Sequence, residues 1–480
     1  MLLLAASLAL HAGSASVLVV EHDRLSPAEQ VLAITAQGLA NQKSLRVWMR
    51  TGGIGALLEP RVGASVATPW EVVDSIRPRV RGVIVYRLGT PSLNVATSLC
   101  GPLNAVALDE SLLAEAAKHR LTVLRDVRGQ NEQDLLAAEP SLFARGIAVE
   151  QVLDKPSHLR DLAVARHAFT FDSPTSAWRT QVARQLGPNA KVYGWGRDEF
   201  TWIADLARGG AVGVPADWSL NLSALQHMKV PIRRPKYAKI PKPKTPHRTI
   251  AFVISDGDNI QWLGGNFALD RGFWASPHRG KIPISWEVAP ILADDAPAIL
   301  GYLYKTATKN DDFITGPGLP SYTFPHEQPN MPQLASLAET LLKRSDLQVV
   351  SILNDNAGSP SETVPILDLK QVTGVIYKDY SPYNRRKGEL LRHKGKICIC
   401  YRFLLWEGLT GIDDLVKQVQ GMHEDPTNVD SYALINVHAW SFGKMGGPME
   451  ATHQVIQKLG QSARVVTASQ LVEEVTKLAR

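Results

Sequence analysis

Short apolar runs that end in a group of polar side chains recur along the second half of the chain. The first run, residues 249–254, is followed by Ser-Asp-Gly-Asp-Asn at positions 255–259. Six further runs show the same change, at residues 282–289, 313–316, 349–353, 374–377, 397–401 and 432–437. Because such runs are typical of buried strands, a last one at 463–467 brings the number of predicted strands to about eight.

Amphipathic patterns with helical spacing lie between these runs, at residues 296–306, 334–344, 412–422 and 450–459. Strands that alternate with helices indicate a parallel sheet. With right-handed crossovers, residues 248–480 are predicted to form a TIM-like (β/α) barrel, either regular or distorted. Barrel active sites lie at the carboxyl ends of the strands, where the polar residues fall. Asp311 and Asp312 precede their run and are expected on the opposite, structural face.

The first half of the chain has the pattern of two small α/β domains, at residues 17–131 and 132–229. In the first, the pattern predicts strands at 17–20, 45–48, 83–86, 105–108 and 121–124, and helices such as 27–40 and 110–118. In the second, it predicts a helix capped by Asp172 or Ser173 and ending at Leu186, then elements at 191–194, 199–208 and 211–215.

The first 15 residues have the pattern of a signal peptide. They contain leucines at 2–4, 8 and 10, no Asp, Glu, Lys or Arg, and small residues at 12–15 that resemble a cleavage site. The usual Lys or Arg ahead of the apolar stretch is missing, and a buried first strand or helix is the alternative. We expect a secreted or periplasmic protein without stable membrane insertion, because no segment has about 20 consecutive apolar residues.

One segment accounts for the net charge of +6 at pH 7. Residues 233–248 contain seven Lys or Arg and no acid, and taking these seven charges away leaves −1. The prolines of residues 230–247 predict an extended Lys/Pro-rich linker. Docking on an acidic polymer would need aromatic stacking partners, and only Tyr237 is available, so a solvated linker is favoured and no nucleic-acid partner is expected.

Motifs of one known family occur in both halves of the chain. They are KVYGWG and DEF within residues 191–200, PADW and NLS within 215–223, SDGDNIQW at 255–262, WASPHRGK at 274–281 and GPG at 316–318. On these residues, most of the chain resembles the GxGYxYP putative glycoside hydrolases. The resemblance implies small α/β domains ahead of a barrel-like C-terminal domain, and a carbohydrate substrate.

The motif that names the family falls at residues 319–325, with changes. Tyr322 and Pro325 match, whereas Leu319 and Ser321 stand where the family has glycines and Phe324 replaces the second Tyr. A side chain in place of glycine adds bulk where a backbone could approach a ligand, and Phe lacks a hydroxyl that could bond a sugar. The geometry of this loop is therefore expected to differ from the family pattern.

Glycoside hydrolysis uses two carboxyl groups, one neutral and one ionised. We expect Asp256 or Asp258 to form this pair with Glu287 or Asp379. Repulsion between two carboxylates at one strand end keeps a proton available, and the apolar setting beside Trp286 is expected to raise the pKa of Glu287. The alternatives are that Asp256 caps a helix, that Glu287 is a satisfied buried acid and that Asp379 fixes its loop.

Amides, hydroxyls and rings near the same strand ends are candidates for sugar binding, by hydrogen bonds or by stacking. They are Asn259, Gln261, Trp262, Tyr322, Asp355, His438 and Trp440, with Trp406 as a further stacking ring. For His438, a hydrogen-bonded core histidine is the competing interpretation, and for Trp262 and Trp440 it is packing.

Two other functions remain open at this point. One is a metal-dependent hydrolase such as a polysaccharide deacetylase, with Asp256, Asp258 and His438 as ligands, although the chain lacks a His-x-x-x-His pair. The other is a noncatalytic carbohydrate-binding protein. We predict neither a metal nor a cofactor, and the sequence gives no basis for an oligomeric state.

Overall fold

The computed structural model describes residues 16–60 and 63–478 and divides the chain into two compact units. The N-terminal unit comprises residues up to 205, 213–231 and 294–299, and the C-terminal unit comprises 206–212, 232–293 and the chain from 300 onward. The predicted signal peptide, residues 1–15, lies outside the described residues. In the described part, every helix is too short or too polar to cross a membrane.

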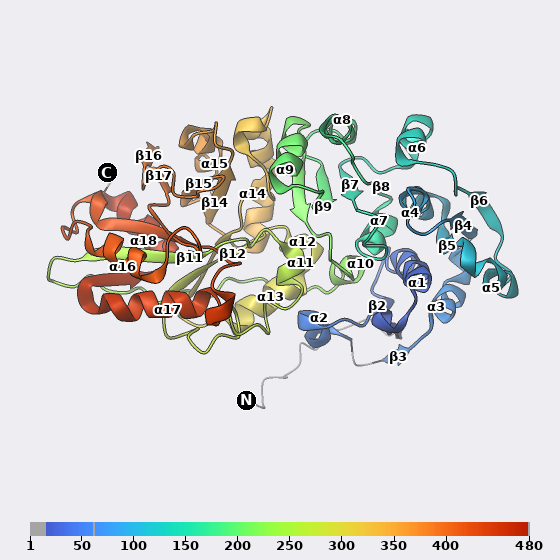
Figure 1. The fold of residues 1–480 in the computed structure, drawn as a ribbon, viewed down its shortest axis with the longest axis horizontal. Helices are drawn as coiled ribbons and strands as arrows, with labels where there is room; N and C mark the ends of the chain where they lie inside the picture. Colours follow the sequence, from blue (N-terminus) through green and yellow to red (C-terminus); the bar gives the residue numbers. More distant parts are fainter. Residues whose placement is uncertain (1–15, 61–62, 479–480) are drawn as a thin grey trace. The chain divides into compact units, whose positions relative to one another are not determined.

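The N-terminal unit carries its strands in three small sheets (Figure 1). Their strand orders are β2-β1-β3, β5-β4-β6 and β10-β9-β7-β8, and β1, β4 and β7 each pair in parallel with two neighbours. The strands are β1 (Val17–Val20), β2 (Val47–Met49), β3 (Ala64–Val66), β4 (Gly82–Tyr86), β5 (Ala105–Asp109), β6 (Val123–Asp126), β7 (Ile147–Glu150), β8 (Phe169–Phe171), β9 (Lys191–Gly194) and β10 (Val212–Pro215). The mixed α/β class is confirmed, and β3, β7 and β8 are strands that the apolar pattern did not predict.

Helix α7 packs against both α1 and α4 in this unit. A capping box starts α1, where the side chains of Ser26 and Glu29 each bind the other residue's backbone N–H. Gly38 allows α1 to approach α7, because a Cβ at this position would lie 2.7 Å from the Asp161 carbonyl oxygen. The helices are α1 (Pro27–Ala40), α2 (Gly53–Leu58), α3 (Pro69–Ser75), α4 (Ser92–Leu103), α5 (Leu113–Lys118), α6 (Glu132–Ala138), α7 (Arg160–Arg166), α8 (Ser176–Leu186), α9 (Glu199–Arg208) and α10 (Leu222–Leu225).

The predicted cap of α8 was wrong. Thr175 caps this helix and accepts the Trp178 N–H at 3.3 Å, whereas the Ser173 hydroxyl donates to the Thr175 carbonyl at 2.8 Å. Ser173 thus stabilises the turn that precedes the helix. The helix therefore begins after Pro174, at Ser176.

His158 lies in the loop after β7. The centre of its ring is 5.1 Å from that of Trp218 and 6.4 Å from that of His22. Burial lowers the pKa of His158 to about 4; His22 and Lys155 contribute to the shift, and Asp217 opposes it. The folded protein therefore holds a neutral imidazole here at neutral pH.

Acid is expected to destabilise the N-terminal unit through this histidine. Below about pH 6.5 the unfolded chain binds a proton on His158 and the folded protein does not, so stability is lost as the pH falls, by about 3 kcal/mol at pH 4. The measurement is the free energy of unfolding in urea at pH 7 and at pH 4. Its fall between the two pH values should be about 3 kcal/mol smaller in His158→Gln than in the parent. Equal losses in both proteins would contradict a buried neutral imidazole.

The eight apolar runs of the second half are all strands of the C-terminal unit (Figure 1). One sheet has the order β13-β12-β11-β19-β18, with β20 also paired to β11, and a second has the order β14-β15-β17-β16. The strands are β11 (Arg248–Ile254), β12 (Ile284–Val288), β13 (Asp311–Thr315), β14 (Val349–Asn354), β15 (Gly374–Asp379), β16 (Leu390–His393), β17 (Lys396–Cys400), β18 (Phe403–Leu405), β19 (Tyr432–Val437) and β20 (Ala463–Val466). The helices from residue 260 onward are α11 (Ile260–Leu263), α12 (Leu292–Asp295), α13 (Pro297–Thr306), α14 (Met331–Ser345), α15 (Val364–Leu367), α16 (Ile412–Gln420), α17 (Pro448–Leu459) and α18 (Ala468–Leu478), of which α12 and α13 are in part assigned to the N-terminal unit.

A closed hydrogen-bonded barrel was not found in the described chain, because the parallel strands are divided between the two sheets. Between β13 and β14 the connection is made at Ser351, whose N–H donates to Thr315 Oγ1 at 3.0 Å and whose carbonyl accepts the Gly318 N–H at 3.0 Å. On the other side the chain runs directly from β17 into β18. There the Tyr401 N–H donates to β15 and the Arg402 N–H to β19, so one segment bonds to both sheets.

Helix α18 completes the core of this unit. Its buried residues Leu471, Val472 and Val475 cluster with apolar side chains of β11, β13, β15, β17 and β19. At the amino ends of the strands, the Ser469 N–H and hydroxyl donate to Asp312 at 3.0 and 2.9 Å. Asp312 is buried, in agreement with the structural role expected for it.

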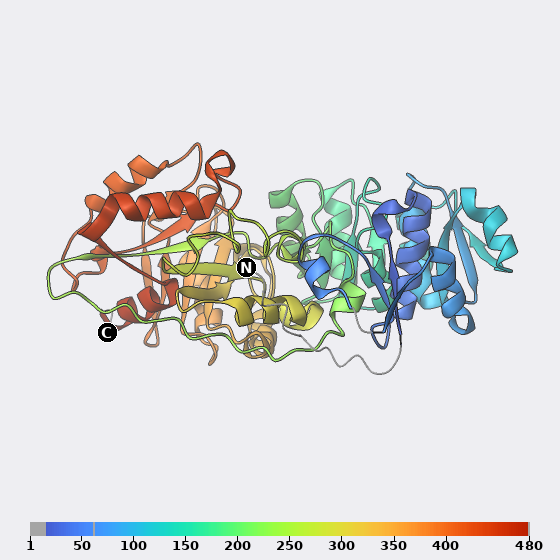
Figure 2. The ribbon, with the colours of Figure 1, turned by 90° about the horizontal axis from the view of Figure 1, so that it is seen from below.

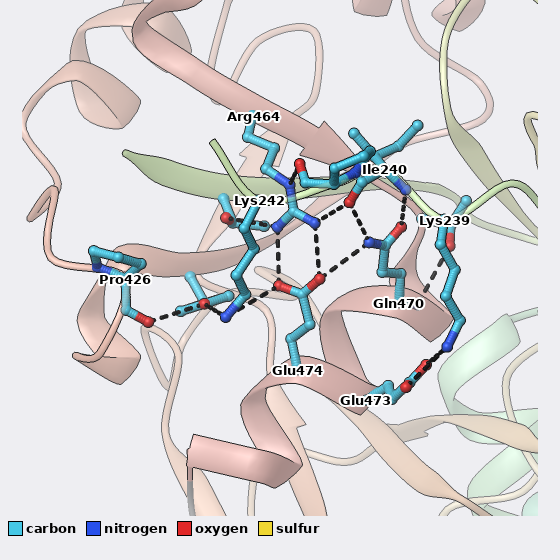
Figure 3. A network of polar contacts seen from close by, with 12 residues as sticks. Lys239, Ile240, Lys242, Pro426, Arg464, Gln470, Glu473 and Glu474 are labelled. Atoms are coloured by element: carbon cyan, nitrogen blue, oxygen red, sulfur yellow. Dashed lines mark hydrogen bonds and ion pairs between the residues drawn. The ribbon is translucent and has the colours of Figure 1, made fainter. Parts of the chain in front are cut away.

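Residues 232–247, which we call the strap, form neither helix nor strand and run along the C-terminal unit (Figure 2). The strap is not solvated along its length. Figure 3 shows its polar contacts: Arg464 donates to the carbonyls of Ile240 and Pro241, Gln470 donates to Ile240 at 2.7 Å, and Arg464 also pairs with Glu474. The strap thus holds the start of α18 and the strand β20 from outside.

Candidate active site

The loop after β11 places Asp256 and Asp258 at the carboxyl end of a central strand. Asp256 has a left-handed backbone, with φ of 68°, is partly exposed, and accepts a hydrogen bond from the Ser255 hydroxyl. Asn259, rather than Asp256, caps α11, because Asn259 Oδ1 accepts the Trp262 N–H at 3.3 Å. Asp258 is buried, so Asp256 is the acid of this loop that solvent reaches most easily.

Two glycines allow the loop to lie directly on the ends of β12 and β13. A Cβ on Gly257 would be 1.8 Å from the Glu287 carbonyl oxygen, and one on Gly316 would be 2.4 Å from the Asp258 nitrogen. Side chains do not fit at such distances from backbone atoms, so both positions require glycine. The close contact fixes Asp256 beside β12.

Gly257→Ala is therefore expected to destabilise the C-terminal unit by about 1–3 kcal/mol, because the added methyl group overlaps backbone atoms that cannot move aside. Gly443→Ala is the matched control, since a Cβ there meets nothing within 4 Å. Urea unfolding of the two variants should separate them, and equal stabilities would contradict the close packing of this loop.

Glu287, near the end of β12, lies inside the unit. Its carboxylate is inaccessible to solvent and accepts three hydrogen bonds, from Lys378 Nζ at 2.8 Å, Ser351 Oγ at 2.6 Å and the Asp256 N–H at 3.1 Å. Burial raises the pKa of Glu287, whereas Lys378 and Ser351 oppose the rise. The three donors thus stabilise the ionised form of a carboxyl group that burial alone would neutralise.

Lys378 is the residue of this site that the sequence prediction missed. It is 1% exposed, and its ammonium lies 5.0 Å from the centre of the Tyr383 ring. Alternate residues of a strand point to the same face, and Lys378 comes two residues after Ile376, which lies in the core. This spacing was the available signal, because a lysine on the buried face of a strand needs an acidic partner.

Asp379 points to the face of β15 opposite that of Lys378. Tyr377 OH donates to Asp379 Oδ1 at 3.2 Å, and Arg386 Nε lies 3.2 Å from Asp379 Oδ2. Burial raises the pKa of Asp379, and Arg386 opposes the rise. The structure therefore brings Glu287 together with Asp256, and Asp379 together with Tyr377 and Arg386.

Asp355 takes part in the turn after β14. Its Oδ1 accepts the N–H groups of Ala357 at 3.0 Å and Gly358 at 2.8 Å. This carboxylate therefore shapes the loop in which it lies.

The variant motif at residues 319–325 is part of the interior. Tyr322 is buried and packs edge to face against Phe324, with 5.8 Å between the ring centres. Leu319, Ser321 and Phe324, the three departures from the family motif, are all buried as well. The larger side chains are thus accommodated by packing.

His438 follows β19 and stacks on Trp406, with 3.9 Å between the ring centres and an angle of 8° between the planes. Its Nδ1 lies 2.8 Å from Ser441 Oγ. Burial lowers the pKa of His438, Lys378 lowers it further and Asp256 raises it. Burial thus favours the neutral imidazole of His438.

The rings predicted to stack on sugars differ in exposure. Trp440 is 52% exposed, and its ring centre lies 4.9 Å from that of Trp262. Trp262 contacts Phe267 and Phe273 edge-on, each at 4.8 Å. Gln261 is partly exposed on the same short helix as Trp262. Trp440 is therefore the more exposed ring of this pair, and it lies on a base of packed aromatic side chains.

Within residues 16–60 and 63–478, no three His, Cys, Asp or Glu side chains form a group able to hold a metal ion. A cavity of about 320 Å³ lies in the N-terminal unit, with Leu18, Val47, Ile76 and Arg79 in its lining. None of the candidate acids lines this cavity. The acids belong instead to strand ends of the C-terminal unit.

Three family models match the chain. They are the GxGYxYP_N second domain at residues 80–140, the GxGYxYP third domain at 145–227 and the GxGYxYP putative glycoside hydrolase C-terminal domain at 247–476. A solved structure of a putative hydrolase from Bacteroides thetaiotaomicron is similar, with a TM-score of 0.87 and 24% identity over 96% of this chain and 95% of that one. This likeness concerns the fold. None of the curated proteins compared with the chain matches it. On these matches, which cover most of its length, the chain belongs to the GxGYxYP putative glycoside hydrolase family.

Proposed function

We propose that the C-terminal unit hydrolyses glycosidic bonds of an oligo- or polysaccharide, with Asp256 and Glu287 as its pair of carboxyl groups. The observation that supports this pair is the 3.1 Å hydrogen bond from the Asp256 N–H to Glu287 Oε2, which joins acids from two neighbouring strand ends. Family membership supports the reaction class.

The two acids differ in a way that suits different tasks. Asp256 is partly exposed and can protonate the oxygen of the leaving sugar. Glu287, held ionised by Lys378, supplies negative charge as positive charge develops on the sugar ring. The bond from the anomeric carbon to the leaving oxygen breaks, and water adds its oxygen to that carbon and returns a proton to Asp256.

Sugar binding would rest on the exposed rings and amides around Asp256. Trp440 offers an open indole and Gln261 a partly exposed amide, while His438 lies close to Asp256. In this proposal they orient the substrate, and Asn259, Asp355 and Tyr322 shape the loops in which they lie.

The test is release of reducing ends from a broad glycan panel by the purified protein, with and without EDTA. The Asp256→Asn/Glu287→Gln double variant, with its fold confirmed by circular dichroism, serves as the blank. Release that survives EDTA and disappears in the blank is the expected result. Release abolished by EDTA would favour the metal-dependent hydrolase, and glycan binding without release would favour a noncatalytic protein.

A further inference from the structure

Trp218, three residues after the end of β10 in the N-terminal unit, leaves 58% of its surface exposed. Large aromatic side chains are mostly buried, because the indole contributes much apolar area when it packs. An exposed indole held in place is therefore a notable feature of this unit, and it belongs neither to the candidate active site nor to the cavity lined by Leu18 and Arg79.

The indole is held by two neighbours from the loop after β7. The Lys155 ammonium lies 4.5 Å from the ring centre of Trp218, and the His158 ring meets it edge-on at 5.1 Å. Lys155 is itself fixed by an ion pair with Asp217. A ring fixed in this way loses little conformational freedom when a ligand binds, which favours binding.

A buried glutamine joins the two loops that carry these residues. Gln151 Nε2 donates to the Asp217 carbonyl at 2.9 Å and to the His158 carbonyl at 3.1 Å. The loops follow β7 and β10, and ligands of parallel α/β sheets bind at the carboxyl ends of the strands. Asp217 is 5% exposed, and its Oδ1 has no hydrogen-bond partner among the described residues. A ligand site is thus expected at this position, where Asp217 Oδ1 can accept a hydrogen bond from a ligand.

The charges around the ring cancel. Lys155 and Asp217 form an ion pair, and His158 is neutral at neutral pH. The groups around the ring therefore carry no net charge that would favour an anionic or a cationic ligand. A flat apolar face beside hydrogen-bonding groups without net charge matches the alternating C–H and O–H groups of an uncharged sugar ring.

We propose that Trp218 is the platform of a second binding site, for neutral carbohydrate, in the N-terminal unit. A sugar ring stacks on the open part of the indole, and the Lys155 ammonium donates to one of its hydroxyls. The site retains polysaccharide without cleaving it, and it does not depend on turnover in the C-terminal unit.

Native affinity electrophoresis in gels containing starch, xylan, mannan or β-glucan tests this site on the full chain. Trp218→Ala is compared with Trp70→Ala, which removes a partly exposed indole that stacks on His119 elsewhere in the same unit. The Asp256→Asn variant separates binding from turnover. We expect at least one neutral polysaccharide to retard the parent, with affinity about tenfold or more weaker in Trp218→Ala and unchanged in Trp70→Ala.

The readouts keep this proposal distinct from the proposed hydrolysis. Retardation that depends on Trp218 and persists in Asp256→Asn supports the site even if no glycan is cleaved. Equal retardation of the parent and Trp218→Ala, retardation only by an anionic polymer such as dextran sulfate, or none at all, would overturn it. Lys155→Met should weaken binding and shift the Trp fluorescence if the ammonium holds the ring.

Discussion

Lys378→Met is expected to destabilise the C-terminal unit by about 3–5 kcal/mol, because it leaves the buried Glu287 carboxylate without its cation. Both side chains are almost completely inaccessible to solvent, so water cannot replace the lost partner. The remaining donors to Glu287 are the Ser351 hydroxyl and the Asp256 N–H. The measurement is the free energy of unfolding in urea at pH 7.

A double-mutant cycle shows whether the loss comes from the pair itself. Lys378→Met/Glu287→Gln removes both charges and keeps a side chain that can still bond Ser351 and the Asp256 N–H. We expect the double variant to lose clearly less free energy of unfolding than the sum of the losses in the two single variants, because neither charge is then left without its partner. Additive losses would show that the two groups are not coupled.

Asp256→Asn is expected to lower kcat/KM for any glycan that the protein cleaves by about 10²- to 10⁴-fold, the usual contribution of a general acid. The amide keeps the size of the side chain and its hydrogen bond from Ser255 but cannot deliver the proton. Stability should change little, because Asp256 is partly exposed and does not cap α11.

Asp379→Asn is the matched control for this experiment. It makes the same chemical change at the end of β15, on the face that carries Tyr377 and Arg386 rather than Glu287. Activity close to that of the parent is expected. A similar loss in folded Asp379→Asn, or full activity in Asp256→Asn, would contradict the choice of Asp256 and Glu287.

The strands of the C-terminal unit could be predicted because the information is local. Apolar residues 249–254 followed by acids and amides are visible in a window of about ten residues, and β11 covers this run. The division into two sheets is not local. It depends on the spacing between β13 and β14, where the Thr315 side chain bonds to Ser351 across a junction without a ladder.

The candidate site was predictable in part for the same reason. Asp256 and Glu287 meet because each stands at the end of a parallel strand, and strand ends can be read from the sequence. Which face a residue occupies is equally readable, since Lys378 and Asp379 are neighbours and must point apart. Exposure is not readable: Trp262 packs against Phe267 and Phe273 and is only partly exposed, whereas the nearby Trp440 is 52% exposed.

The contacts of the strap could not be predicted from its amino-acid composition. Its lysines and prolines are those of a solvated connector, and its extended backbone fits that description. Its carbonyls nevertheless bind Arg464 and Gln470, which follow it by more than 200 residues. Such partners cannot be inferred from the segment itself.

The place of α18 in the core has a consequence for the order of events during synthesis. Residues 468–478 cover apolar side chains of strands that begin with β11, more than 200 residues earlier. Until the ribosome has released this helix, those side chains stay open to water and to other nascent chains. We therefore expect the core of the C-terminal unit to close only after α18 has been synthesised.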